Sequence, residues 1–170
     1  MNIGIEPSPV HRVAPAVVIR VSPSGVEARY PHQIEEARKD MLLKITSTGP
    51  LENIERRFQD SAARHQFGII ATHDLQDAMK KKGVELQMEC RIYEVCNPLQ
   101  AKKVLESDGA ISTALPCWIS VYGSPAHYTL ATMRPTELMK AFGNPEIEPV
   151  AREVEEVLLE MMNEAAGNKG

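Results

Sequence analysis

The chain has 170 residues, of which 43% are hydrophobic and 25% charged, and its formal net charge is -4 at pH 7. This length and composition predict one folded domain with a single core and exclude wholesale disorder. The acidic balance argues against a nucleic-acid partner, because such partners are bound through basic surfaces. The acidity is concentrated in residues 144-170, which hold seven acidic and two basic residues.

The sequence shows no sign of export or membrane insertion. No apolar run follows a basic start, and no apolar stretch approaches the roughly eighteen residues of a membrane span. The three cysteines, an odd number, are typical of thiols that are kept reduced. We therefore expect a cytoplasmic protein without a membrane span.

Residues 1-40 are predicted to be a proline-rich arm. They contain five of the twelve prolines, a density that breaks helices and leaves little room for a core. Two segments of strand-like composition flank the turn sequence Ser22-Pro23-Ser24-Gly25, so we expect a β-hairpin over residues 16-30. A lone hairpin is only marginally stable in water. We therefore expect the arm to dock on a protein partner or on a twin subunit.

An α+β domain is expected over residues 41-165, and residues 166-170 are expected to form a flexible tail. Alternating apolar and polar residues around Leu43 predict a half-buried strand. Apolar residues at helical spacing then follow Pro50, and they predict a helix that is ended by Gly68.

Further strands and helices follow along the chain. Residues 67-72 are predicted to form a strand, and residues 74-82 a short helix. The inward residues of that helix are expected to be Leu75, Ala78 and Met79. Alternation over residues 86-96 predicts a third strand.

The second half of the domain completes the sheet. Asn97 as the cap and Pro98 in the first turn predict a helix that reaches Ser107. Residues 117-122 and 127-133 are predicted to form a hairpin, and an amphipathic helix is expected over residues 149-164. These elements predict a single mixed or antiparallel sheet with helices packed mainly on one face.

Two of the thiols are the candidate catalytic residues. Cys96 precedes the predicted helix cap Asn97, and the helix N-terminus is expected to favour its thiolate. Cys117 follows Pro116 at the start of a later strand. The two thiols could meet as a redox couple, as a nucleophile with its resolving partner, or as half of a metal site. The alternative is that both are small buried hydrophobic side chains.

His73 and Asp74 are candidate binding residues, because they lie where a strand gives way to a helix. Asp74 is also expected to cap that helix. His73 could act as a general base, bind a soft metal with the two thiols, or be a hydrogen-bonded residue at a strand end. The sequence motifs of nucleotide binding, zinc proteases and serine hydrolases are absent. No cofactor and no resident metal are therefore assigned.

Several short motifs together resemble the family catalogued as domain of unknown function 302. They include Phe67-Gly68, Cys96-Asn97-Pro98, Leu115-Pro116-Cys117 and Val121-Tyr122. The resemblance covers residues from about 41 to 162 and implies a β-α-β(4)-α domain, often a homodimer, with no established activity. Family members often have an acidic or small residue where this chain has His73, so the resemblance gives that histidine no role.

The first hypothesis is a non-enzymatic binding or accessory domain, a homodimer whose arm docks on a partner or on the twin subunit. One alternative is a thiol-dependent protein of redox or sulfur chemistry that uses Cys96 and Cys117. A second alternative is a site for a small ligand or a metal near His73 and the two thiols. The candidate binding residues are His73, Asp74, Cys96, Asn97, Pro98, Pro116 and Cys117.

Overall fold

The structure, a computed structural model, describes residues 20–22, 25–27, 41–125 and 127–168. The chain divides into two units, Met1–Glu36 and Ala37–Gly170. In the first unit, strands β1 (Arg20–Ser22) and β2 (Gly25–Glu27) pair in antiparallel fashion. They fall within the hairpin predicted over residues 16-30, whose other residues lie outside the described part of the chain.

A five-stranded antiparallel sheet forms the centre of the second unit. Its strands are β3 (Leu42–Ser47), β4 (Gly68–Asp74), β5 (Glu89–Cys96), β6 (Cys117–Ser124) and β7 (His127–Met133). Their order is β3-β7-β6-β5-β4, and every neighbouring pair is antiparallel. The α+β class is therefore confirmed, and the sheet is antiparallel rather than mixed.

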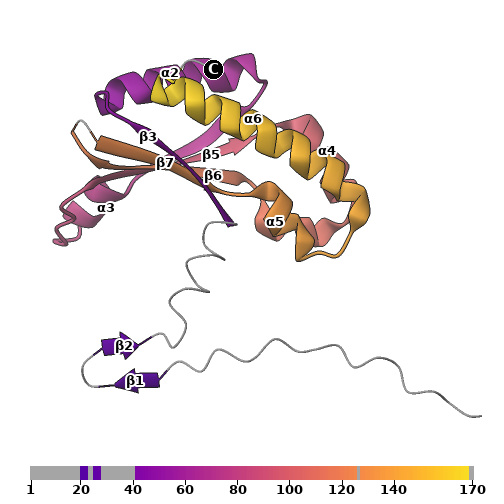
Figure 1. Ribbon diagram of the computed structural model, residues 1–170, viewed down its shortest axis with the longest axis horizontal. Coiled ribbons are helices and arrows are strands. Elements are labelled where there is room, and N and C mark those ends of the chain that lie inside the picture. Colours follow the sequence, from indigo (N-terminus) through magenta and orange to yellow (C-terminus); the bar gives the residue numbers. More distant parts are fainter. Residues whose placement is uncertain (1–19, 23–24, 28–40, 126, 169–170) are drawn as a thin grey trace, which may run out of the picture. The chain divides into compact units, whose positions relative to one another are not determined.

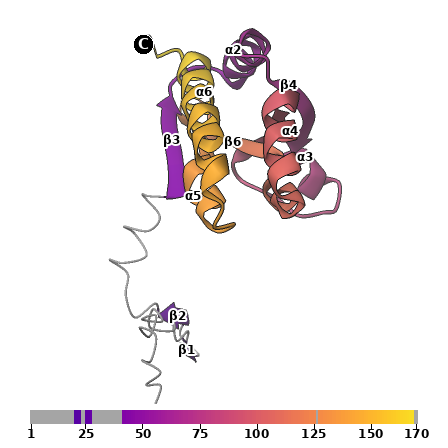
Figure 2. The same cartoon turned by 90° about the vertical axis from the view of Figure 1, so that its right-hand side faces the viewer.

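The helices lie over one face and at both ends of this sheet (Figure 1). They are α2 (Leu51–Arg64), α3 (Leu75–Lys80), α4 (Pro98–Ser107), α5 (Pro135–Lys140) and α6 (Glu148–Ala166), together with the 3₁₀ helices η1 (Gly109–Ala114) and η2 (Pro145–Ile147). Helices α2 and α6 lie side by side over one face (Figure 1), with α4 and α5 at one end of the sheet (Figures 1 and 2). No helix among the described residues is long and apolar enough to cross a membrane.

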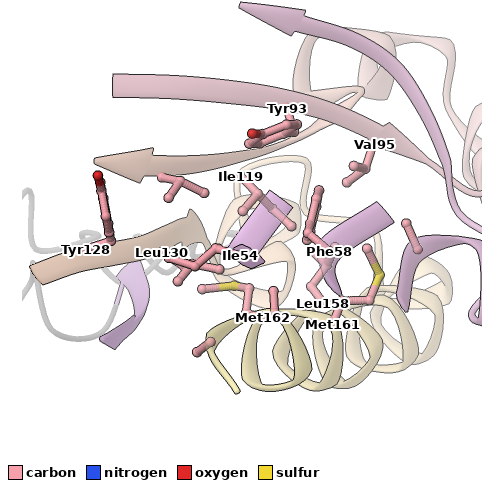
Figure 3. Close-up of a cluster of buried hydrophobic side chains, with 14 of the residues drawn as sticks. Ile54, Phe58, Tyr93, Val95, Ile119, Tyr128, Leu130, Leu158, Met161 and Met162 are labelled. Carbon is pink, nitrogen blue, oxygen red and sulfur yellow. The ribbon is translucent and has the colours of Figure 1, made fainter. Parts of the chain in front are cut away.

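The main core lies between this face and the two long helices (Figure 3). Ile54 and Phe58 point into it from α2, and Leu158 points into it from α6; all three are fully buried. The Phe58 and Tyr93 ring centroids are 5.1 Å apart. Since each fully buried large apolar side chain contributes about 1.5–3 kcal/mol, this cluster fixes how α2 and α6 sit on the sheet.

Two helix ends differ from their predictions. Helix α2 stops at Arg64, where Gln66 takes a left-handed conformation with φ of 62°, and Gly68 already belongs to β4. Helix α3 is confined to Leu75–Lys80, and no residue of it is buried, so Ala78 is exposed rather than inward. The reason is geometric: α3 packs beside β4 and β5 and contributes no residue to the main core.

The C-terminal helix is longer than predicted, and the domain contains a helix that was not predicted. Helix α6 extends to Ala166, which is buried and accepts a hydrogen bond of 2.9 Å from Ser47 Oγ. The tail expected over residues 166-170 therefore does not include Ala166. Helix α5, together with η1 and η2, occupies segments for which the sequence analysis predicted no element.

Candidate functional site

A cavity of about 330 Å³ opens at the end of the sheet where β5 leads into α4 and η1 leads into β6. Helices α5 and α6 complete its walls. It is lined by Phe67, Val95, Cys96, Asn97, Gln100, Ala101, Val104, Thr113, Ala114, Leu115, Pro116, Cys117, Trp118, Thr132, Met133, Pro135, Leu138, Met139, Val150, Ala151 and Val154. None of these described residues is charged, so the interior suits an uncharged molecule.

The first wall is positioned by the cap of α4. Asn97 Oδ1 accepts hydrogen bonds from the backbone N–H groups of Leu99 and Gln100, at 3.0 and 3.2 Å. These bonds satisfy helix donors that would otherwise lack partners, and Pro98 is the first helical residue, as predicted. The cap therefore fixes the direction in which the chain leaves β5 beside the cavity.

The opposite wall depends on a carboxylate of α6. Glu155 accepts hydrogen bonds from the backbone N–H and the hydroxyl of Thr136, the former at 3.2 Å, and Arg134 lies 2.5 Å from it. Burial would raise the pKa of Glu155, but the hydrogen bonds from Thr136 and Arg134 outweigh it and lower that pKa. The carboxylate thus anchors the start of α5, and with it the cavity residues Leu138 and Met139.

The two candidate thiols line the same cavity. Cys117 is the cross-strand partner of Val95, the residue before Cys96. Burial raises the pKa of Cys117 to about 11, and proximity to Cys96 adds to the rise. Burial also raises the pKa of Cys96, the direction opposite to that expected from the helix N-terminus. Both thiols are therefore protonated at pH 7, the form that is a weak nucleophile.

The structure brings four of the seven candidate binding residues to this cavity, namely Cys96, Asn97, Pro116 and Cys117. Pro98 is exposed and is not part of the lining. Asp74 caps α3 by accepting a hydrogen bond of 2.9 Å from the Asp77 backbone N–H. Its structural role as a cap is therefore confirmed.

His73 does not share the cavity. Its Nε2 lies 2.7 Å from Glu94 Oε1, and its ring centroid lies 6.4 Å from that of Trp118, a residue of the cavity lining. Among residues 41–125 and 127–168, no three His, Cys, Asp or Glu side chains converge on a common point where they could hold a metal. His73, Cys96 and Cys117 are therefore not brought together into such a group in the described part of the chain.

A polar groove adjoins the cavity between α4 and α6. It has a volume of about 520 Å³ and shares Phe67, Asn97, Gln100 and Val154 with the cavity. Lys102, Lys103, Glu106 and Glu153 also line it. Sequence reasoning missed both the groove and α5, although Pro135 at a first helical position and the acidic Glu137 behind it were signals for that helix.

Comparison with known proteins relates this chain to a family and to a solved structure. The model of the family described as Domain of unknown function DUF302 matches residues 43–165. The chain belongs to the DUF302 family. A solved structure, titled "Crystal structure of uncharacterized conserved protein DUF302 from Bacillus stearothermophilus", is 22% identical, has a TM-score of 0.70, and is matched over 74% of this chain and 98% of that chain. That likeness shows the fold alone. No curated protein matches the chain.

Proposed function

We propose that this DUF302 domain is a binding protein that holds a small, uncharged, largely apolar molecule in the cavity beside Cys96 and Cys117. The observation that supports the proposal is a cavity of about 330 Å³ without a charged lining residue in the described chain. Ligand sites are typically concave, apolar and furnished with a few polar groups. Here the polar side chains of the lining are those of Asn97, Gln100, Thr113 and Thr132.

The two protonated thiols suit a ligand-binding cavity better than a catalytic site. A neutral thiol behaves as a small hydrophobic group and weak hydrogen-bond donor. Thiol-disulfide chemistry instead requires a thiolate, and burial disfavours that form at both Cys96 and Cys117. The burial of both thiols therefore supports binding over the redox and sulfur-handling alternative.

Binding can be measured with Trp118, because it is the single tryptophan of the chain and lines the cavity. The full chain would be titrated with a panel of neutral one-ring aromatic and short aliphatic compounds while tryptophan emission is recorded. We expect a saturable change for a subset of the panel. Ala101→Phe, which fills the cavity from α4, should abolish it.

Ala63→Phe is the matched control, since Ala63 is exposed on α2 and lies outside the cavity. It should leave the titration unchanged. The proposal is wrong if no neutral compound gives saturation, or if both Ala→Phe variants bind as the parent chain does. Circular dichroism of both variants would show whether the fold is intact.

We further propose that the domain self-associates through the sheet face opposite α2 and α6. On that face Trp118 is 53% exposed and Met133 44% exposed, which is unusual for a face in contact with water. The register also places Lys44 of β3 and Glu94 of β5 on it, on opposite sides of β7 and β6. A second copy turned by a two-fold rotation would therefore oppose unlike charges.

Light scattering after size exclusion tests this association. We expect twice the 18.9 kDa mass of the chain, a monomer for Lys44→Glu or Glu94→Lys alone, and recovery of the dimer in the double charge-swap variant. A monomeric parent chain would end the proposal. The same measurement on a chain shortened to residues 41-170 tests whether the arm docks on the twin subunit, because only a docking arm would change the number of subunits or the stability.

A further inference from the structure

The rim of the cavity lies on the exposed face of the sheet. Of the described residues that line the cavity, three are exposed, namely Thr113, Trp118 and Met133. Trp118 and Met133 are also among the large hydrophobic side chains that the surface exposes. Ligand pockets usually bury about 70–90% of the surface of the ligand. A molecule in the cavity of one copy therefore stays exposed at this rim.

Strand register places the two apolar rim side chains next to each other on one face. Ser120 pairs with Ala131, and Trp118 and Met133 lie two residues further along β6 and β7. Residues two apart in a strand share a face, and neighbours point to opposite faces. Since Ile119 points into the main core, Trp118 and Met133 lie together on the face opposite α2 and α6.

The proposed two-fold contact gives these two side chains a counterpart. In the strand order β3-β7-β6-β5, a two-fold axis that runs parallel to the strands between β7 and β6 exchanges β7 with β6 and β3 with β5. This is the rotation that brings Lys44 of one copy over the strand of Glu94 in the other. It also places Trp118 of each copy opposite Met133 of the other copy. A thioether against an aromatic ring is a favourable contact.

We propose that the second copy closes the cavity, with its Met133 covering Trp118 at the rim, so that the dimer is the form that encloses the ligand. This inference rests on the ligand site and the self-association proposed above, and it adds that the two are linked. A ligand that binds the dimer more tightly must also stabilise the dimer, because binding free energies are reciprocal. Each dimer then contains two closed cavities, related by the two-fold axis.

Access to the cavity can be measured with iodoacetamide, a small uncharged reagent that alkylates thiols. Cys96 and Cys117 line the cavity, and both are free thiols. We expect them to react at least about tenfold more slowly in the parent dimer than in monomeric Lys44→Glu, because the open form of a closed site is populated to about 10% or less. Mass spectrometry of the cysteine peptides measures the rates, and light scattering of the same samples gives the number of subunits.

The double variant Lys44→Glu/Glu94→Lys is the matched control, because it carries the same change at Lys44 but should dimerise. It should regain the slow alkylation of the parent chain. Toluene, followed through the emission of Trp118, should bind this double variant about tenfold more tightly than it binds Lys44→Glu.

The outcomes separate this inference from the proposals on which it rests. A monomeric parent chain would end the self-association and the closure together. A dimer whose Cys96 and Cys117 react as fast as those of Lys44→Glu would overturn the closure alone, and so would equal toluene affinities of Lys44→Glu and the double variant. Slow alkylation in both dimeric chains and fast alkylation in the monomer would support the closure.

Discussion

Cys117 is a thiol whose burial has a measurable consequence for stability. Its folded-state pKa of about 11 lies above the ordinary value of 9.0. The neutral thiol is therefore favoured by folding, and the stabilisation is fully present below pH 9 and is lost as the pH rises through 11. A rise of this size corresponds to about 2–3 kcal/mol.

We expect the free-energy difference between the parent chain and Cys117→Ser to shrink by about 2 kcal/mol between pH 8 and pH 11.5, following that linkage. Urea unfolding at a series of pH values measures it. A difference that stays constant over this interval would show that Cys117 titrates as an exposed thiol. Alkylation of Cys117 at pH 8 should correspondingly be slower than that of free cysteine.

Gly123 is the residue on which the β6–β7 hairpin depends. Its φ is 150°, and a Cβ atom built there would lie 2.1 Å from the His127 carbonyl oxygen. Gly123→Ala must therefore move backbone, and we expect it to lower the free energy of unfolding by about 2–4 kcal/mol. Gly109→Ala has nothing within 4 Å of its new methyl group and should change stability by less than about 0.5 kcal/mol. Thermal unfolding of both variants measures the two changes in stability.

Helix α5 is held in place by one side chain of another helix. Glu155 joins Arg134 and Thr136 to α6 and is only 13% exposed. We expect Glu155→Ala to cost about 1–3 kcal/mol and to abolish ligand binding, because the cavity wall formed by α5 would detach. In the parent chain the folded-state pKa of Glu155 is lowered. The stabilisation that the ionised Glu155 carboxylate gives is therefore present above the ordinary carboxyl pKa, and it is lost as the pH falls through the lowered value.

Glu156→Ala is the control for this anchor. Glu156 is the next residue along α6, is exposed, and should be replaceable within about 0.5 kcal/mol. Chemical unfolding and the tryptophan titration would be run on both variants. Equal effects of the two substitutions would show that general helix electrostatics, rather than the anchor, stabilises α5.

Elements with strong periodicity or strong caps could be predicted from the sequence, and short elements held by tertiary contacts could not. Asn97 and Pro98 are sufficient to predict the start of α4, because a helix cap acts within a few residues. Helix α5 has only six residues, too few for a stable helix alone. It depends on Glu155, about twenty residues later, and no local pattern contains that information.

The whole domain contains two hydrophobic clusters joined by α6. The larger lies between the sheet, α2 and α6, and the smaller contains Val104, Ile111, Met139, Ile147 and Ala151. The cavity lies between them, since its lining takes Val95 from the first and Val104 from the second. The sequence analysis could place Cys96 and Cys117 at strand ends. It could not show a cavity, because a gap between two clusters is a property of packing.

Because the smaller cluster has fewer buried residues, it should open locally at a lower free energy than the domain as a whole. Ile147 and Leu158 provide a matched pair, being 2% and 0% exposed in the smaller and the larger cluster. Each truncation to alanine should cost about 2–5 kcal/mol at its site. We expect Ile147→Ala to speed amide hydrogen exchange in α4, η1 and α5 while β5 and β6 stay protected. Leu158→Ala should instead speed exchange throughout the sheet and lower the melting temperature. Mass spectrometry of peptides from both variants measures these exchange rates.

Uniform acceleration of exchange in Ile147→Ala would mean that the two clusters unfold as one, and that the cavity cannot open without global unfolding. Local acceleration would instead give a ligand its route of entry, because the walls from α4 and α5 could part while the sheet keeps Cys96 and Cys117 in place.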